Sequence, residues 1–421
     1  MRGKYILAYG SRITESLVRS RSGGIIAALV FSTLATGVLQ ICLPLELRQL
    51  RTTPNEIGLT LSMFGLGMFV FEWLWGLIAD RFGYGAPLVA SQLLYGAFIV
   101  AVSQVRSVSL IAAGYFLASG MMVAVGPIAR SYIGTALHAH LRATGLALLA
   151  SQWVIAEAVG AGVGGALIDH FPIREVMLVA AVLPLVSAVL VFPVFRGFTI
   201  VDHRSRQNEV REDTAVAEPS VVRVLAITAS LVLLVQVGLG GELALLPLLV
   251  TNRLQLSAAA AGSAMLAVGL IGGVLLVPGG NASDRWGRKP TMIVGGIICA
   301  AGYIGYAVAG TFAGVIAAAA IRAVGAALIW PAATAWIAES MPRRRHALYM
   351  GLFGEFENIG VTAGPIIGGV VWSVAGIQSA FFAYAAAALL AALVAAVLVQ
   401  RREAPVMQPG RALAQDLDSR Q

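Results

Sequence analysis

The amino-acid sequence contains two halves that match at a fixed spacing of 204 residues. The segment 76–83, Gly-Leu-Ile-Ala-Asp-Arg-Phe-Gly, recurs at 280–287 as Gly-Asn-Ala-Ser-Asp-Arg-Trp-Gly. The same spacing relates the glycine-rich segment 160–165 to the segment 364–369. Several matches in one register indicate two homologous units in tandem, so the fold should contain one arrangement twice.

Composition places both halves in a membrane. Hydrophobic residues make up 58% of the chain and charged residues 12%, with a mean hydropathy of +0.83, whereas soluble domains are about one quarter charged. The charges separate apolar runs of about 20 residues, the length of a membrane-spanning helix. The sequence therefore predicts an all-α membrane protein with twelve transmembrane helices, at about 23–47, 56–79, 86–105, 108–134, 143–168, 175–196, 222–250, 257–280, 290–310, 312–339, 347–374 and 377–400. Tandem repeats in so apolar a chain are typical of membrane transporters.

The distribution of basic residues predicts the orientation in the membrane. With a cytoplasmic N-terminus, most Lys and Arg residues fall on the cytoplasmic side, as the positive-inside rule requires. The other side then holds only Arg48, Arg51, Arg106, Arg174 and Arg253. We therefore expect both termini in the cytoplasm and the spans in a bacterial inner membrane. The expected units are an N-terminal tail (1–22), a six-helix bundle (23–196), a cytoplasmic linker (197–222), a second six-helix bundle (223–400) and a C-terminal tail (401–421).

Other functional classes are disfavoured. The net charge of +8 comes from segments that flank the spans, so it indicates topology rather than nucleic-acid binding. Cys42 and Cys299 both fall in apolar runs, which favours buried side chains over a disulfide or a metal site. The sequence has no Ser/His/Asp context, cluster of metal ligands or nucleotide-binding loop. We expect no catalytic residues, no metal and no cofactor, hence no enzyme, and we expect a monomer.

Both copies of Gly-x-x-x-Asp-Arg-x-Gly resemble the hallmark hairpin of the Major Facilitator Superfamily, which lies between spans two and three and again between spans eight and nine. The resemblance extends over essentially the whole chain. It implies two pseudo-symmetric six-helix bundles around a central cavity that opens alternately to each side of the membrane. It also implies a gating role for Gly76, Asp80, Arg81, Gly83, Gly280, Asp284, Arg285, Gly287, Arg288 and Glu339.

The chemistry of the hairpins fits such a role. Glycines permit close helix packing and a tight turn. Asp80 and Asp284 stand at helix ends, where each could dock on the N-terminus of a helix of the opposite bundle, whose partial positive charge favours a carboxylate. By family resemblance, Asp80 would latch the outward-facing state. The first hairpin lacks the basic pair that the second has at Arg288 and Lys289, and simple positive-inside anchoring is the alternative for both.

The glycines of span five resemble the antiporter signature of drug exporters, with its proline present instead in span eleven, at Pro365. Small residues spaced by four give a smooth helix face on which a second helix can slide or rock. We therefore favour export over import, with generic close packing as the alternative reading. The expected packing glycines are Gly160, Gly164, Gly165, Gly364, Gly368 and Gly369.

Charged and polar residues inside the spans are the candidates for binding substrate or protons. A charge in the bilayer core costs at least about 2.5–3.5 kcal/mol, so each must be paired, protonated or in contact with water. The candidates are Glu355, Glu157, Arg322, Asn358, Glu242, Glu357, Glu72 and Gln40. Arg322 can neutralise one acid, which we expect on the adjacent span eleven. The remaining acids could take up protons reversibly, because burial favours the protonated form. Some of them could instead be neutral hydrogen-bonding groups between helices.

Span eleven presents its two acids on opposite faces. At 100° per residue, Glu355 shares a face with Asn358 and Thr362, whereas Glu357 shares a face with Gly360 and the packing glycines. Glu355 is therefore expected to line the cavity and to couple protons to transport. Glu157 is the matching candidate of the first half, although it also shares a face with glycines.

The sequence thus favours a secondary active transporter that moves a small organic solute by alternating access, in exchange for protons. The surplus of acids suits a cationic or neutral lipophilic solute better than an anion. An uptake symporter or a facilitator for a metabolite is the alternative within transport. A transporter-like sensor without flux is the alternative from another class.

Overall fold

The computed structural model describes residues 21–137, 139–195, 219–340 and 346–399. These ranges are helical apart from short connections. Twelve helices among them are long and apolar enough to cross a membrane, so the predicted all-α class and number of spans are confirmed. The predicted C-terminal tail, and most of the predicted N-terminal tail and linker, lie outside the described residues.

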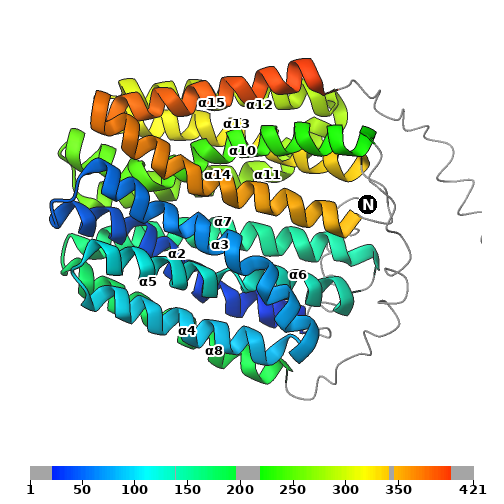
Figure 1. Ribbon diagram of the computed structural model, residues 1–421, viewed down its shortest axis with the longest axis horizontal. Helices are drawn as coiled ribbons and strands as arrows, with labels where there is room; N and C mark the ends of the chain where they lie inside the picture. The colour runs from blue at the N-terminus through cyan, green and yellow to red at the C-terminus, as the bar shows by residue number, and fades with distance from the viewer. Residues whose placement is uncertain (1–20, 138, 196–218, 341–345, 400–421) are drawn as a thin grey trace, which may run out of the picture.

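The helices follow the order that the apolar runs predict. The first half consists of α2 (Ser22–Gln49), α3 (Pro54–Phe82), α4 (Gly85–Gln104), α5 (Val108–Met122), α6 (Val125–Ala136), α7 (Ala139–Ile168) and α8 (Ile173–Phe195). The second half consists of α10 (Pro219–Leu248), the π-helical turn η1 (Leu249–Arg253), α11 (Ala258–Trp286), α12 (Arg288–Val308), α13 (Phe312–Ser340), α14 (His346–Ala375) and α15 (Ile377–Leu398). Helices α5 and α6 together form the fourth span. The two halves pack side by side as two helical bundles, α2 to α8 in the lower part of Figure 1 and α10 to α15 in the upper part.

The tandem repeat of the sequence is also a repeat of contacts between the bundles. Helix α3 crosses α14 where Gly58 meets Gly369: a Cβ on Gly58 would lie 3.0 Å from the Cα of Gly369. Helix α11 crosses α7 in the same way, and a Cβ on Gly262 would lie 3.1 Å from the Cα of Gly165. Both members of the second pair follow from the first by the 204-residue spacing. The bundles are therefore related by pseudo-symmetry, and two glycine crossings hold them together.

The two Asp-Arg hairpins lie at the opposite end of the molecule from these crossings. Helices α3 and α11 continue through the Asp-Arg pairs and end one residue before Gly83 and Gly287. Both glycines have positive φ angles, 78° and 90°, a conformation that residues with a side chain rarely adopt. We call this end of the molecule the hairpin end, and we call the end with the glycine crossings the crossing end.

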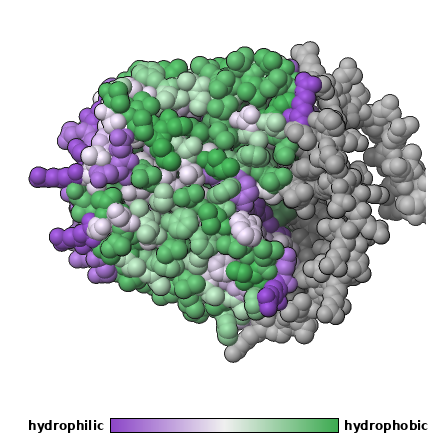
Figure 2. Space-filling view, viewed as in Figure 1, coloured by the Kyte–Doolittle hydropathy of each residue, from purple (hydrophilic) through white to green (hydrophobic). Residues whose placement is uncertain are grey.

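The outer surface is suited to lipid. Figure 2 shows a broad hydrophobic face across the helices, with hydrophilic residues at the crossing end, on the left of the view, and others on the right, beside the grey residues. Large aliphatic side chains are exposed along this surface, among them Val189, Val274 and Val397. Such exposure would be a liability in water but matches the hydrocarbon core of a bilayer.

Candidate functional site

A cavity of about 640 Å³ lies between the two bundles. Its walls come mainly from α2, α3, α6 and α7 of the first bundle and from α10 to α14 of the second. Most of the lining is apolar, including Trp153, Tyr303 and Trp330. The charged and amide side chains that reach it are Gln40, Glu72, Arg130, Glu157, Gln236, Glu242, Arg322, Glu357 and Asn358. This size and this lining are typical of a site for a small organic molecule.

The cavity is closed toward the crossing end and less obstructed toward the hairpin end. The crossings of α3 with α14 and of α7 with α11 bring backbones into direct contact on the closed side. Toward the hairpin end, an added Cβ at Gly76, Gly272 or Gly354 would meet no atom of another described residue within 4 Å. The close helix approach predicted at Gly76 is therefore absent in this conformation. The structure captures a state in which the bundles are apart at the hairpin end.

Glu72 on α3 lines the cavity and links the two bundles. One of its carboxylate oxygens accepts a hydrogen bond from Arg130 on α6, at 2.6 Å. The other oxygen accepts a hydrogen bond from the amide of Asn358 on α14, at 2.9 Å. Arg130 neutralises Glu72 within the first bundle, and the bond to Asn358 reaches the second bundle.

Glu157 on α7 is held by a neutral partner. The side-chain amide of Gln40 on α2 donates a hydrogen bond to its carboxylate. This contact depends on tight packing of α2 against α7: a Cβ on Gly160 would collide with the carbonyl oxygen of Leu34, 2.1 Å away. The packing role predicted for Gly160 therefore also brings Gln40 to Glu157.

Arg322 and Glu242 form an ion pair beside the cavity. The Nε of Arg322, on α13, lies 2.8 Å from a carboxylate oxygen of Glu242 on α10, and their side chains are 7% and 2% exposed. The hydroxyl of Tyr306 on α12 donates a hydrogen bond to the other oxygen, at 2.8 Å. The expectation that Arg322 pairs with span eleven is wrong: its partner belongs to span seven. The order of helices around a bundle, which decides this pairing, cannot be read from helical periodicity.

The acids of α14 are placed differently from the prediction. Glu357 lines the cavity and accepts hydrogen bonds from Gln236 at 3.2 Å and from the indole of Trp330 at 2.5 Å. Glu355 is not among the residues that line the cavity, although Asn358 is. Helical periodicity placed the two acids on different faces of α14. Helix α10 packs against the glycine face and α3 packs against Thr362, yet it is Glu357 that lines the cavity.

The predicted packing glycines face helices, in a pattern that repeats between the halves. Gly160 and Gly164 pack on α2, and Gly165 packs on α11 of the other bundle. Of their counterparts, Gly364 packs on α10, Gly368 packs on α15 and α10, and Gly369 packs on α3 of the other bundle. In each half, the first two glycines therefore pack their helix against its own bundle, and the third glycine packs it against the opposite bundle.

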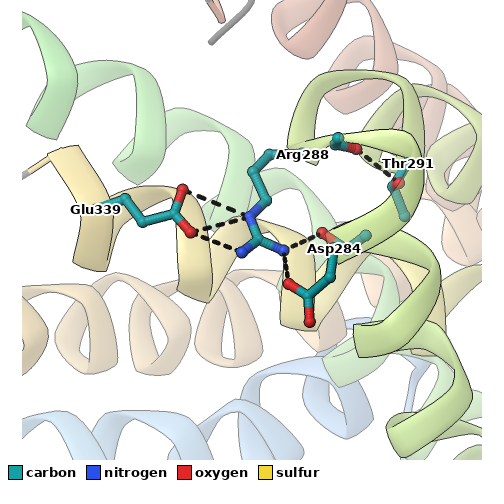
Figure 3. Close-up of polar contacts among 6 residues, drawn as sticks. Asp284, Arg288, Thr291 and Glu339 are labelled. Atoms are coloured by element: carbon teal, nitrogen blue, oxygen red, sulfur yellow. Dashed lines mark hydrogen bonds and ion pairs between the residues drawn. The ribbon is translucent and has the colours of Figure 1, made fainter. Parts of the chain in front are cut away.

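The second hairpin carries an ion-pair network inside its own bundle. Arg288 on α12 contacts Asp284 on α11 at 2.5 Å and Glu339 on α13 at 2.6 Å, and it also donates a hydrogen bond to Ser283 at 3.0 Å. Figure 3 shows the guanidinium of Arg288 between the two carboxylates. Within the described part of the chain, Asp284 therefore contacts its own bundle in this conformation and no helix N-terminus of the other bundle. Arg285 and Gly280 lie on the same final turns of α11.

The first hairpin makes fewer contacts. Asp80 is exposed, and within the described part of the chain it makes no hydrogen bond or ion pair. The guanidinium of Arg81 lies over the ring of Phe82, 5.4 Å from its centroid. Among the residues that the structure describes, Asp80 thus makes no latch with the opposite bundle in this state.

Sequence reasoning missed several residues of the site. Gln236, Trp330 and Tyr306 are neutral, so no charge singled them out, and each reaches its acid from another helix. Trp153 could have been identified from its spacing, because it lies one helical turn before Glu157 and so shares its helix face. Asp169, at the end of α7, carries a charge but lies outside the predicted spans.

Comparisons with known proteins agree with this arrangement. The family model described as Major Facilitator Superfamily matches residues 25–248 and 228–416. The multidrug resistance protein MdtG of Klebsiella pneumoniae (strain 342) is 26% identical over 390 residues, which cover 88% of this chain and 91% of that protein. The niacin transporter NiaP of Acinetobacter baylyi is 24% identical over 183 residues, covering 44% of this chain, and here the chain spans only 42% of the relative's length.

Among solved structures, the chain is similar to a bacterial homolog of the human lysosomal transporter Spinster in an inward-facing and occupied conformation. The TM-score is 0.74 at 12% sequence identity, and the match covers 90% of this chain and 96% of that one. At this identity the likeness shows the fold alone.

Proposed function

Because the chain belongs to the Major Facilitator Superfamily, we propose that it is a secondary active transporter that exports a small organic solute in exchange for protons. The hairpin end is then the cytoplasmic end, as the distribution of basic residues predicts. The state described here is accordingly inward-facing, with its cavity accessible from the cytoplasm.

The observation that carries the proposal is the pairing of the acids in the cavity. Glu72 and Glu242 each have an arginine partner, at 2.6 and 2.8 Å. Glu157 and Glu357 contact neutral donors, and among the described residues neither forms an ion pair. One uncompensated acid therefore projects from each bundle into a largely apolar cavity.

Two such acids provide a physical basis for exchange. A buried carboxylate without a counter-charge is stabilised either by a proton or by a cationic ligand. A proton and a cationic solute therefore compete for the same groups, and the occupant can bias the bundles only through different affinity for the two states. Export is further supported by the antiporter-like glycine series of span five and by the similarity to a multidrug resistance protein.

Uptake of a metabolite is the second candidate, and the similarity to a niacin transporter favours it. The direction of coupling separates the two candidates. An exporter accumulates solute on the side from which protons leave, whereas a symporter accumulates solute on the side to which protons flow. A sensor without flux would bind solute and accumulate none.

The test begins with a growth-inhibition panel that compares cells expressing the protein with cells lacking it. A solute identified in this way is then followed in proteoliposomes under an imposed pH gradient. We expect accumulation against the proton flow, abolished by a protonophore and by Glu157→Gln or Glu357→Gln. Glu175→Gln, an exposed acid of α8 outside the cavity, is the control and should transport normally. Accumulation with the proton flow would refute export, and binding without flux would refute transport.

Charge selectivity has its own probe pair. Tetraphenylphosphonium and tetraphenylborate have nearly the same shape and opposite charge, so their binding to the purified protein isolates the effect of charge. We expect the cation to bind more tightly, with the preference reduced in the two glutamine variants. Tighter binding of the anion would show that Arg130 or Arg322, and not the uncompensated acids, sets the selectivity.

A further inference from the structure

The N-terminus of α11 is completed by a residue of the other bundle. The first turn of a helix leaves backbone N–H groups without an intrahelical acceptor. In α11, Ala260 N–H donates to the side chain of its own N-cap, Ser257, at 3.2 Å. The N–H groups of Ala258 and Ala259 donate instead to the two carboxylate oxygens of Asp169, at 3.0 and 3.2 Å. Two donors of this first turn are thus satisfied across the bundle interface.

Asp169 reaches this position because of the glycine crossing beside it. It follows directly on the last residue of α7, four residues after Gly165. The contact of Gly165 with Gly262 brings the end of α7 against the start of α11. A carboxylate at a helix N-terminus gains both charge-assisted hydrogen bonds and the favourable potential of the helix dipole.

The pseudo-equivalent crossing has no such contact. At the start of α3, Thr53 and Glu56 form a capping box within their own chain segment, and Pro54 has no N–H to satisfy. Ser373, which corresponds to Asp169 by the 204-residue spacing, donates a hydrogen bond to Val370 O on its own helix. Parting α3 from α14 at this end therefore breaks no helix cap, whereas parting α7 from α11 breaks a bidentate one.

We propose that Asp169 is a latch that holds the bundles together at the crossing end and so favours the state with the hairpin end open. It is a positioning residue: it acts on access to the cavity and not on the solute. Opening the crossing end separates Asp169 from α11 and leaves two N–H groups without their acceptors. The proposal rests on alternating access, which the proposed function also uses, but not on the direction of transport, the solute or the coupling ion.

The latch would complement Asp80. Both aspartates stand at the ends of long helices that form the bundle interface: Asp80 lies in the last turn of α3, and Asp169 directly follows α7. They lie at opposite ends of the molecule, and only Asp169 is engaged in this state. Loss of Asp169 should therefore favour the state that is open at the crossing end, and additional loss of Asp80 should return the equilibrium toward that of the parent protein.

The effect of Asp169 on the two states can be measured as the accessibility of a cavity residue from each face of the membrane. Met265 on α11 lines the cavity and is 6% exposed, so Met265→Cys serves as the reporter in the full-length chain with Cys42 and Cys299 replaced by alanine. A membrane-impermeant maleimide is added to one face of the membrane at a time. In the parent protein, labelling should be faster from the face of the hairpin end.

Asp169→Ala should raise the labelling rate from the crossing end by about twofold to thirtyfold, the range that loss of a helix cap produces in an equilibrium. Labelling from the hairpin end should fall by a smaller factor, because the state open at that end starts as the major one. Asp169→Asn keeps one oxygen acceptor, so it should give a smaller shift. His170→Ala, an exposed neighbour whose side chain makes no cap, should match the parent. Adding Asp80→Asn to Asp169→Ala should return the rates toward those of the parent.

Unchanged labelling in Asp169→Ala would overturn the proposal, as would an equal change in His170→Ala. A variant that lowers thermal stability without changing the ratio of the two labelling rates would show that Asp169 only caps α11. If Asp169→Ala does not reach the membrane, the Asp169→Asn variant decides between these outcomes. The result is independent of proton coupling, because a failure of proton-driven flux would leave the labelling ratios as predicted.

Discussion

Arg322→Met should destabilise the protein, because it leaves Glu242 buried without its counter-charge. Two unit charges 2.8 Å apart attract by about 6 kcal/mol at an effective dielectric constant of about 20. The cost of removing both groups from water offsets part of this attraction, yet removal of one partner of a buried pair still costs about 3–5 kcal/mol. Glu242 can bind a proton and keeps its hydrogen bond from Tyr306, which favours the lower end of that range.

The assay is thermal unfolding of the purified protein in detergent. An unfolding entropy of about 2.1 cal/mol/K per residue over 421 residues converts this loss into a decrease of about 3–6 °C in Tm. Glu242→Gln should also lower Tm, because it leaves the guanidinium unpaired. The double variant Glu242→Gln, Arg322→Met removes both charges and should recover most of the loss. A double variant as unstable as the sum of the single variants would refute the reasoning, because it would show that the two residues contribute independently.

Three further predictions concern the transport cycle. Glu357→Gln and Glu157→Gln should each leave the protein folded but uncouple flux from the pH gradient. Glu355→Gln should have a smaller effect, because its side chain does not line the cavity. Uncoupled flux in Glu355→Gln together with normal flux in Glu357→Gln would show that Glu355 is the coupling acid, as periodicity predicted. Asp80→Asn should slow transport at least tenfold while the amount of protein in the membrane stays constant, since Asp80 is exposed in this state; loss of the protein from the membrane would mark it as structural. Cysteines placed at Asp80 and Asp284 should react with an impermeant reagent from the same, cytoplasmic face, and labelling from opposite faces would contradict the two-bundle topology.

Much of the fold could be predicted from the sequence, because it depends on local properties. A bilayer requires long apolar helices, so the boundaries of the spans can be recognised where an apolar run begins and ends. Span four, expected at 108–134, is found at Val108–Ile133. The spacing of the repeat implied pseudo-symmetry, and the paired crossings of Gly58 with Gly369 and of Gly165 with Gly262 show it in three dimensions. The turns at Gly83 and Gly287 could likewise be predicted, because a positive φ selects glycine locally.

The residues that line the cavity could be predicted only in part. A charge inside a span is conspicuous in a sequence, so Glu72, Glu157, Glu242 and Glu357 were all identified as candidates, and all four line the cavity. Periodicity then placed Glu355 and Glu357 on opposite faces, but it could not decide which face looks inward. That choice depends on which neighbouring helix covers the glycines.

Pairing was decided by the tertiary structure alone. Arg322 is joined to Glu242 and not to an acid of span eleven, and Asp169 caps a helix that begins 89 residues later in the chain. Such contacts arise from the order of helices around each bundle and from the state in which the two bundles are held. The sequence by itself determined the helices, their number, their repeat and the positions of their charges, since these follow from hydrophobicity and local geometry. The structure decided which charges neutralise one another and which acids are left for a proton or a solute, since that depends on distances between helices far apart in the chain.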